Sequence, residues 1–210
     1  MTIAAVVDWS GPFYAIDEAK AAVREHELGE VVYLALGKRS RQHKPRMQYV
    51  GISSDSETRF NKHHHKLPEI SREFRIWVGE VVSQAVAGRR AARHPVKHTV
   101  AIDRAEWTLA YFLALPLNER KRRKPPPEAI VLFNRWFRDD FETRRYKRPH
   151  RDWPDLIEFC HENEGDGSAA IVWFGSPPRR KHLSKSEVTE LAEIRRLAKA
   201  GVAGATRKHA

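Results

Sequence analysis

The sequence predicts an α/β protein of the α+β type, in which a small antiparallel β-sheet is flanked by helices. One observation is a series of short apolar runs, which have the length and composition of buried strands. Another is that two of these runs, 31–36 and 48–52, are predicted to pair as a hairpin, which makes them antiparallel neighbours. A third is that longer segments with helical periodicity lie before, between and after the runs. This mixture is typical of an α+β fold.

The first 28 residues are predicted to form an N-terminal extension with one helix. A short apolar run from Ile3 to Val7 is followed by the turn-forming pair Gly11-Pro12. The segment 17–28 predicts a helix, because its acidic residues come early and a glycine at position 29 stands where a helix would end.

A β-hairpin is predicted from the next two apolar runs. Residues 31–36 are expected to form a strand that is buried on both faces, and residues 48–52 are expected to be its partner. The connector between them is strongly basic, and we expect it to contact the phosphate groups of a nucleic acid. Its cations are Lys38, Arg39, Arg41, Lys44 and Arg46.

A helix is predicted directly after the hairpin. Ser54 and Glu57 stand three apart, as in a helix capping box. The helix that follows would carry Arg59 and His63, which are four residues apart and therefore lie on one face. Together with Tyr49 at the end of the preceding strand, they would bring three polar side chains to one edge of the sheet.

Two further strands and a helix complete a predicted core over residues 29–120. Apolar residues alternate along 74–78 and predict a strand, and residues 99–102 predict a short one. Asp103 is expected to cap an apolar helix that Pro116 ends. A basic, proline-rich segment then marks the boundary of the core. Its cations are further candidates for nucleic-acid contacts: Arg120, Lys121, Arg122 and Arg123.

Residues 121–210 are predicted to form a basic C-terminal α/β extension that takes part in substrate recognition. Its expected elements are a strand at 130–133, a helix at 155–161, a last strand at 169–174 and an amphipathic helix at 185–200. The small, basic tail that follows is expected to be disordered. Residues 144–148 mix base-stacking with phosphate-binding residue types, although a solvated basic surface explains them nearly as well.

The charge balance predicts a polyanionic partner. The chain has 38 Lys and Arg residues against 27 Asp and Glu residues, which gives a formal net charge of +11. Nucleic acid is the first candidate and an anionic membrane surface is the second. The membrane is disfavoured because no apolar run approaches about 18 residues and the basic residues do not gather on one amphipathic helix.

Cysteine usage and the N-terminus predict a cytoplasmic location. The single cysteine, Cys160, cannot form an intramolecular disulfide. Its apolar surroundings indicate a buried, inert thiol. The N-terminus lacks the basic region of a signal peptide and reaches an acid at Asp8.

Residues 29–118 resemble the GIY-YIG nuclease superfamily, and within it the restriction-type endonucleases. The first motif stands here as Val31-Val32-Tyr33 and the second as Tyr49-Val50-Gly51. Four residues of the family, in chain order, are matched by Arg59, His63, Glu106 and Asn118. The sequence departs from the family in the first motif, where a valine replaces the glycine, and in a longer and more basic connector between the motifs.

The resemblance implies a metal-dependent endonuclease that hydrolyses phosphodiester bonds, with DNA favoured over RNA as substrate. Glu106 would hold a single Mg²⁺ or Mn²⁺ ion. A GIY-YIG-like core would carry the site, and no sequence pattern points to a protein partner.

The resemblance also implies the roles of the other residues. Tyr33 would be the general base, helped by the metal, Arg59 or His63. Arg59 would clamp the scissile phosphate. Tyr49 would orient the attacking water or share its proton with Tyr33, and Asn118 would orient its neighbours.

Each of these residues also has a structural explanation. Asp103 and Glu106 repeat the capping-box spacing, so Glu106 could simply cap a helix. Asn118 could be a C-terminal cap. Tyr33 and Tyr49 are ordinary strand residues by propensity.

Two rival functions follow from these explanations. One is a catalytically inactive nucleic-acid-binding protein with a GIY-YIG-like fold, and the other is a basic scaffold for RNA. The three histidines at 63–65 favour a solvated run over a zinc site, because adjacent histidines do not share a helix face.

Overall fold

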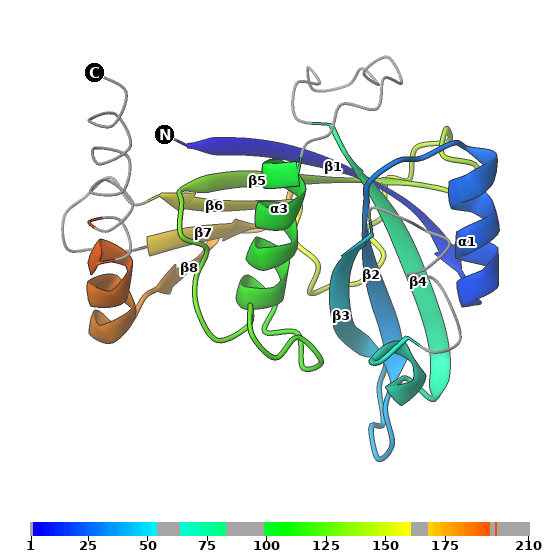
Figure 1. The fold of residues 1–210 in the computed structure, drawn as a ribbon, viewed down its shortest axis with the longest axis horizontal. Coiled ribbons are helices and arrows are strands. Elements are labelled where there is room, and N and C mark those ends of the chain that lie inside the picture. Colours follow the sequence, from blue (N-terminus) through cyan, green and yellow to red (C-terminus); the bar gives the residue numbers. More distant parts are fainter. Residues whose placement is uncertain (1, 54–63, 83–98, 161–167, 194–195, 197–210) are drawn as a thin grey trace, which may run out of the picture.

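The strands of the protein join in one eight-stranded sheet (Figure 1). The computed structural model describes residues 2–53, 64–82, 99–160, 168–193 and 196. The order across the sheet is β3-β2-β4-β1-β5-β6-β7-β8. Along the chain the strands are β1 (Ile3–Phe13), β2 (Val31–Lys38), β3 (Arg46–Ser53), β4 (Arg72–Val81), β5 (Ile130–Phe137), β6 (Leu156–Cys160), β7 (Ser168–Val172) and β8 (Arg179–His182).

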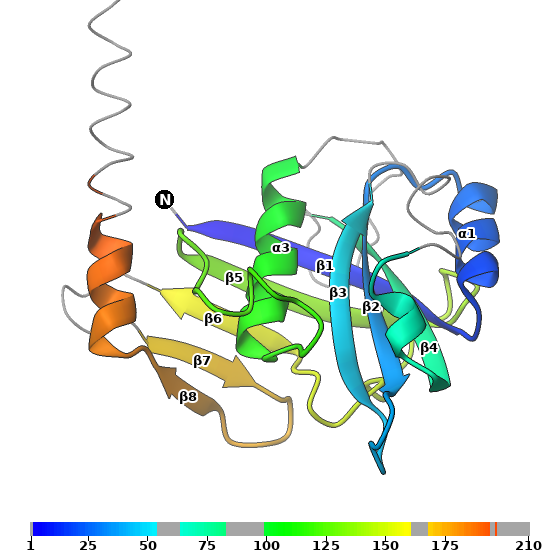
Figure 2. The ribbon, with the colours of Figure 1, turned by 60° about the horizontal axis from the view of Figure 1, so that its bottom comes forward.

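Helices pack on both faces of this sheet. The described helices are α1 (Ile16–Glu25), a 3-10 turn at Leu67–Glu69, α3 (Thr99–Phe112) and a helix over 185–193. Figure 2 shows α3 in front of the sheet and the helix over 185–193 at its left-hand end. Leu191 of that helix shares a core with α3. None of the helices in the described part of the chain has the length and apolarity needed to cross a membrane.

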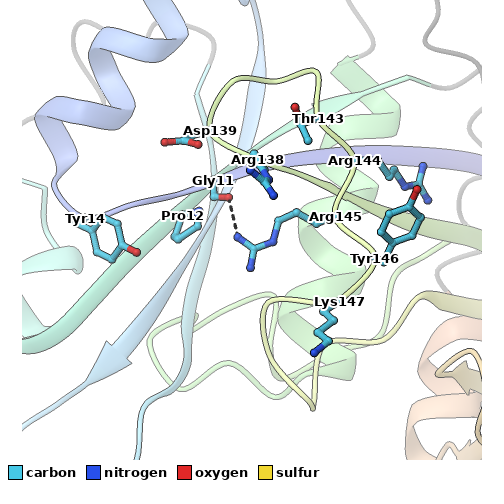
Figure 3. Close-up of a pocket in the computed structure, with 10 residues that line it drawn as sticks. All are labelled: Gly11, Pro12, Tyr14, Arg138, Asp139, Thr143, Arg144, Arg145, Tyr146 and Lys147. Carbon is cyan, nitrogen blue, oxygen red and sulfur yellow. Dashed lines mark hydrogen bonds between the residues drawn. The ribbon is translucent and has the colours of Figure 1, made fainter.

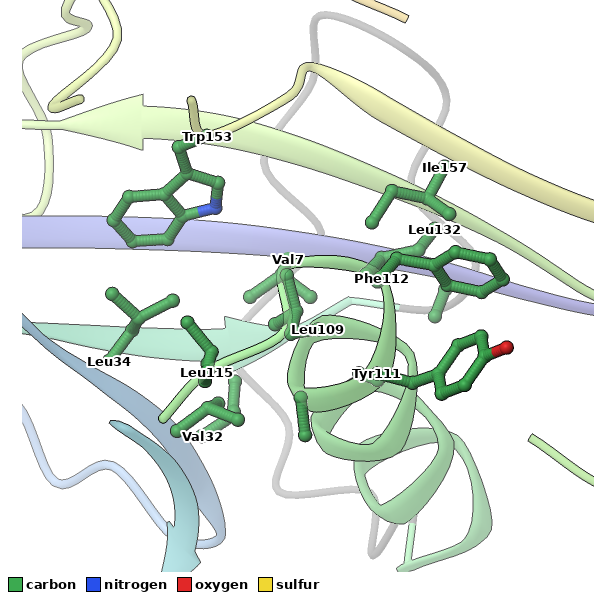
Figure 4. Packing of buried hydrophobic residues seen from close by; sticks show 14 of the residues in the cluster. Val7, Val32, Leu34, Leu109, Tyr111, Phe112, Leu115, Leu132, Trp153 and Ile157 are labelled. Atoms are coloured by element: carbon green, nitrogen blue, oxygen red, sulfur yellow. The ribbon is translucent and has the colours of Figure 1, made fainter. Parts of the chain in front are cut away.

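The alternation of side chains along β2 separates two cores. Val32 and Leu34 point to one face and pack with Leu109 of α3 (Figure 4). Tyr33 points to the opposite face and packs with Val23 of α1. All of these residues are completely buried, which agrees with the prediction of a strand covered on both sides.

The prediction of a small sheet is wrong, because β1 joins two halves. β1 pairs with β4 in antiparallel fashion and with β5 in parallel fashion. Residues on both sides of position 120 therefore contribute strands to the same sheet. Periodicity within a short window does not reveal such a partner, since Asp8 and Arg135 are opposite each other although they lie 127 residues apart.

Three of the predicted elements differ from the structure. Residues 99–102 begin α3 instead of forming a strand, which places Asp103 inside the helix rather than at its cap. The segment predicted as a helix at 155–161 forms β6, because its apolar residues pair with β5 on one side and with β7 on the other. The expected last strand, β7, is followed by β8.

Other predictions are confirmed. The helix over 17–28 corresponds to α1, the hairpin to β2 and β3, the strand at 74–78 to β4, and the strand at 130–133 to β5. The helix predicted directly after the hairpin, the tail and the side chain of Cys160 lie outside the described residues.

Candidate functional site

A pair of tyrosines meets a glycine at the centre of the hairpin. Tyr33 on β2 lies directly opposite Gly51 on β3. A Cβ atom at position 51 would lie 2.5 Å from Tyr33 Oη and 2.9 Å from Tyr49 Cε1. These distances are shorter than any ordinary contact, so only glycine leaves room for both rings.

His64 completes this group of side chains. Its Nε2 lies 2.8 Å from Tyr33 Oη. Its Nδ1 accepts hydrogen bonds from the backbone N–H groups of Lys66, at 3.1 Å, and Leu67, at 3.0 Å. Because Nδ1 is used as an acceptor, the ring proton sits on Nε2 and is donated to the tyrosine oxygen. The structure thus assigns a defined tautomer to His64.

We call Tyr33, Tyr49, Gly51 and His64 the tyrosine–histidine cluster. The Tyr49 and His64 rings meet edge to face, with 5.4 Å between their centroids. Tyr33 has no exposed surface, and the other two side chains are 5% exposed. The hydrogen bond between Tyr33 and His64 therefore lies in a dry environment, where its strength exceeds that of a solvated bond.

Asn118 holds the outer edge of the hairpin. Its Oδ1 accepts a hydrogen bond of 2.9 Å from the N–H of Val50, and its Nδ2 donates one of 2.7 Å to the carbonyl of the same residue. The N–H of Leu117 adds a bond of 3.0 Å to Gln48 O. The segment that contains Leu117 and Asn118 thereby covers the open edge of β3.

Glu106 lies on α3, beside a second carboxylate. Lys121 Nζ forms an ion pair with Glu106 and another, at 2.6 Å, with Asp103 Oδ1. The buried residues of α3 pack with Val32 and not with the core that contains Tyr33. The described contacts therefore join Tyr33, Tyr49 and His64, whereas the described partner of Glu106 is Lys121.

The two carboxylates of α3 provide a test of whether these residues suit a divalent cation. Both direct an oxygen at one ammonium group, which stands where a cation would be held, and carboxylate oxygens are the ligands that Mg²⁺ and Mn²⁺ prefer. Asp103 and Glu106 therefore fit such an ion. Among the described residues, no group of three or more His, Cys, Asp or Glu side chains converges on a single point.

Two of the predicted site residues, Arg59 and His63, lie outside the described residues. The sequence reasoning missed His64, which it placed in a solvated run. The structure buries His64 and leaves His65 exposed, so that interpretation is wrong for His64. The available signal was the run of histidines itself, but only the fold decides which of them turns inward.

The cations predicted to contact phosphates in the connector between β2 and β3 fall into two groups, those that form an ion pair with a glutamate and those that are exposed. Lys38 pairs with Glu73, and Arg39 pairs with Glu69 at 2.9 Å. The other three in the connector, Arg41, Lys44 and Arg46, are exposed.

The second basic group shows the same mixture. Arg120 and Arg123 are exposed. Lys121 pairs with α3, and Arg122 donates a hydrogen bond of 3.2 Å to Pro116 O.

Comparisons with protein-family models, with curated proteins and with solved structures found no match to this chain. The functional argument therefore depends on the geometry of the site.

Proposed function

We propose that the protein is a cytoplasmic, metal-dependent endonuclease that cleaves phosphodiester bonds in DNA, with Tyr33 as its general base. The proposal is carried by the hydrogen bond of 2.8 Å between His64 and Tyr33. An N–H group directed at the phenolic oxygen favours the phenolate over the phenol. A phenolate is able to take the proton from a water molecule that attacks a phosphate. The resemblance to GIY-YIG nucleases and the net charge of +11 agree with this assignment.

The remaining residues of the site would position the two tyrosines or offset the negative charge of the phosphate. Gly51 and Asn118 fix the hairpin so that Tyr33 and Tyr49 keep their relative placement. Glu106, with Asp103 beside it, would hold a single Mg²⁺ or Mn²⁺ ion. Such an ion supplies positive charge to the phosphate oxygens. Arg59 would bind the scissile phosphate, and His63 would assist Tyr33 in releasing its proton.

A catalytically inactive nucleic-acid-binding protein is the second candidate function. Two observations favour it: Tyr33 has no exposed surface, and Glu106 is already paired with Lys121. In this case the tyrosine–histidine cluster would serve only to hold the hairpin together.

Cleavage of supercoiled plasmid DNA in the presence of Mg²⁺ separates the two candidates. We expect Tyr33→Phe to lower the rate by about 100-fold or more, because a general base contributes on that scale. DNA affinity in EDTA should change by less than about twofold, since a lost base affects the transition state and not ground-state binding. Glu106→Ala should abolish Mg²⁺-dependent cleavage, because it removes the residue proposed to hold the ion.

Tyr111→Phe is the matched control. Tyr111 is also a buried tyrosine whose hydroxyl donates to a side chain, at 2.5 Å to Glu187 Oε1, and it lies away from the hairpin. Its substitution should leave cleavage unchanged. Absence of cleavage by the wild-type protein, or full activity of Tyr33→Phe, would favour the binding protein over the nuclease.

A further inference from the structure

A basic hollow lies beyond the C-terminal ends of the parallel strands β1 and β5. It has a volume of about 750 Å³. Figure 3 shows its lining side chains, which come from the end of β1 and from the loop after β5. We call this the basic hollow. It is lined by Gly11, Pro12, Tyr14, Arg138, Asp139, Thr143, Arg144, Arg145, Tyr146 and Lys147.

The loop that supplies most of these side chains is held by its own backbone. The N–H of Arg138 donates to Thr143 O and the N–H of Arg145 donates to Trp136 O, both at 2.8 Å. The Asp140 carboxylate accepts hydrogen bonds from the N–H groups of Glu142 and Thr143. The cations are thus presented by an ordered turn, which reduces the entropy lost when a ligand binds.

Two arginines in the hollow are placed over aromatic rings. The guanidinium of Arg145 lies 5.2 Å from the centre of a Trp77 ring and donates to Gly11 O at 3.4 Å. That of Arg144 lies 5.5 Å from the centre of the Phe137 ring. Such cation–π contacts orient the guanidinium without neutralising its charge.

The side chains that line the hollow carry more positive than negative charge. Arg138, Arg144, Arg145 and Lys147 make no ion pair with any carboxylate among the described residues, and Asp139 is the only acid in the lining. The nearby Asp8 is already taken by Arg135 through two bonds of 2.6 Å.

Arg144 shows the effect of this imbalance. Partial burial and the nearby charge of Arg135 lower the pKa of Arg144, although the charge of Asp8 opposes this shift. A bound anion would offset the repulsion between the two arginines.

Tyr146 adds a feature that anion binding does not require. Its side chain is 97% exposed, although burying an aromatic ring is normally favourable. It stands between Arg145 and Lys147 in the sequence and beside the hollow in Figure 3. An exposed aromatic ring among unpaired cations is the arrangement with which proteins bind single strands, by stacking bases and contacting phosphates.

We propose that the basic hollow binds a single-stranded stretch of nucleic acid, with a base stacked on Tyr146 and phosphates held by Arg138, Arg144 and Lys147. The inference depends on the nucleic-acid partner of the proposed function but not on cleavage. It assigns a binding site separate from the tyrosine–histidine cluster, to which none of the lining residues belongs.

Fluorescence anisotropy with a labelled 12-mer of thymidine, measured in EDTA, tests the site directly. We expect Tyr146→Ala to weaken binding by about fivefold or more, because one base would lose its stacking partner. Tyr146→Phe keeps the ring and should bind like the wild type. Since Tyr146 is almost fully exposed, neither change threatens the fold.

Charge is tested separately by varying the salt concentration. The logarithm of the affinity falls as the logarithm of the salt concentration rises. Lys147→Ala should make this slope less steep by about 0.7, the value for one phosphate of a single strand. Lys185→Ala is the matched control, because Lys185 is also exposed and lies on the helix over 185–193. Its substitution should leave the slope unchanged.

Three outcomes would overturn the proposal: Tyr146→Ala binding as tightly as the wild type, Lys147→Ala leaving the salt slope unchanged, or a 12-base-pair duplex binding as tightly as the single strand. If inorganic polyphosphate displaced the labelled strand as well as unlabelled thymidine 12-mer does, the hollow would be a general anion-binding surface. That result would reject base stacking on Tyr146. A uridine 12-mer run in parallel identifies the polymer, and tighter binding to it would replace DNA by RNA as the occupant.

The same measurement separates this inference from the proposed nuclease. Tyr33→Phe should bind the thymidine 12-mer normally even though it fails to cleave. Loss of cleavage with intact binding at Tyr146 would concern the tyrosine–histidine cluster alone. Normal cleavage with no effect of Tyr146→Ala on binding would reject the hollow alone.

Discussion

The tyrosine–histidine cluster and the basic hollow contain polar groups that the fold treats in opposite ways. In the cluster, Tyr33 and His64 are buried and bonded to each other, and both ring nitrogens of His64 have partners. In the hollow, the cations are exposed or half-exposed and have no carboxylate partner among the described residues. The polar groups of the first arrangement satisfy one another within the fold, whereas the cations of the second are left to interact with solvent or with a bound anion.

Arg135 and Arg144, which belong to the same part of the chain, show the same contrast. Arg135 is 2% exposed and forms a two-pronged ion pair with Asp8 on the adjacent strand. Arg144 is exposed and lacks such a partner among the described residues. The same side chain therefore serves the fold in one position and is left available for binding in the other. The predictions below test this division.

The largest effect is expected at the buried ion pair. Arg135→Ala should lower the free energy of unfolding by about 3–5 kcal/mol, because it leaves the Asp8 carboxylate buried without a partner. Arg144→Ala should change it by less than about 0.5 kcal/mol, as is usual for surface side chains. Urea denaturation of the two variants measures both quantities.

The double variant Asp8→Leu/Arg135→Met controls for the loss of an arginine as such. It removes both charges together and should recover much of the lost stability. A cost at Arg144 equal to that at Arg135 would break the comparison, because it would show that the hollow is also part of the folded core.

A smaller effect is expected at the glycine of the cluster. Gly51→Ala should cost about 1–3 kcal/mol, the usual range for overpacking a core, because its Cβ would lie 2.5 Å from Tyr33 Oη. It should also reduce cleavage, since the Tyr33 ring has to move. In a Tyr33→Leu background the same change should cost clearly less, and thermal denaturation of all four proteins gives this coupling. Equal costs in both backgrounds would mean that the two positions do not interact.

The smallest effect concerns a polar contact at the protein surface, where Glu187 accepts hydrogen bonds from Tyr111 and Ser184. Burial raises the pKa of Glu187, but these hydrogen bonds outweigh it, so that its pKa lies below the ordinary value of 4.5. A carboxyl group with a lowered pKa stabilises the fold above its unfolded pKa. That contribution is lost as the pH falls below 4.5 and through the folded pKa.

We expect this contribution to be about 1 kcal/mol or less, the scale of a single hydrogen bond. Urea midpoints measured at pH 6 and pH 3 should differ less in Glu187→Gln than in the wild type. An unchanged difference would assign the acid sensitivity to other carboxylates.

Local pattern was sufficient for elements whose partners are close in the chain. The hairpin of β2 and β3 follows from two apolar runs joined by a basic connector, and α1 follows from its early acids and the glycine after it. The same reasoning failed at 99–102 and 155–161. Short apolar segments suit either a helix or a strand, and the neighbours that decide between them are distant.

The candidate site likewise contains features that follow from local sequence pattern and features that depend on distant contacts. The sequence pattern predicted the hairpin that carries Tyr33, Tyr49 and Gly51. The register that sets Tyr33 opposite Gly51 comes from the structure. Only the tertiary structure decided that His64 turns inward, that Asn118 bonds to Val50 across 68 residues, and that Glu106 pairs with Lys121.

The basic hollow likewise depends on β1 and β5 lying in parallel. These outcomes depend on which surfaces are buried against each other, and that choice is made by the packing of the whole sheet and not by any single segment.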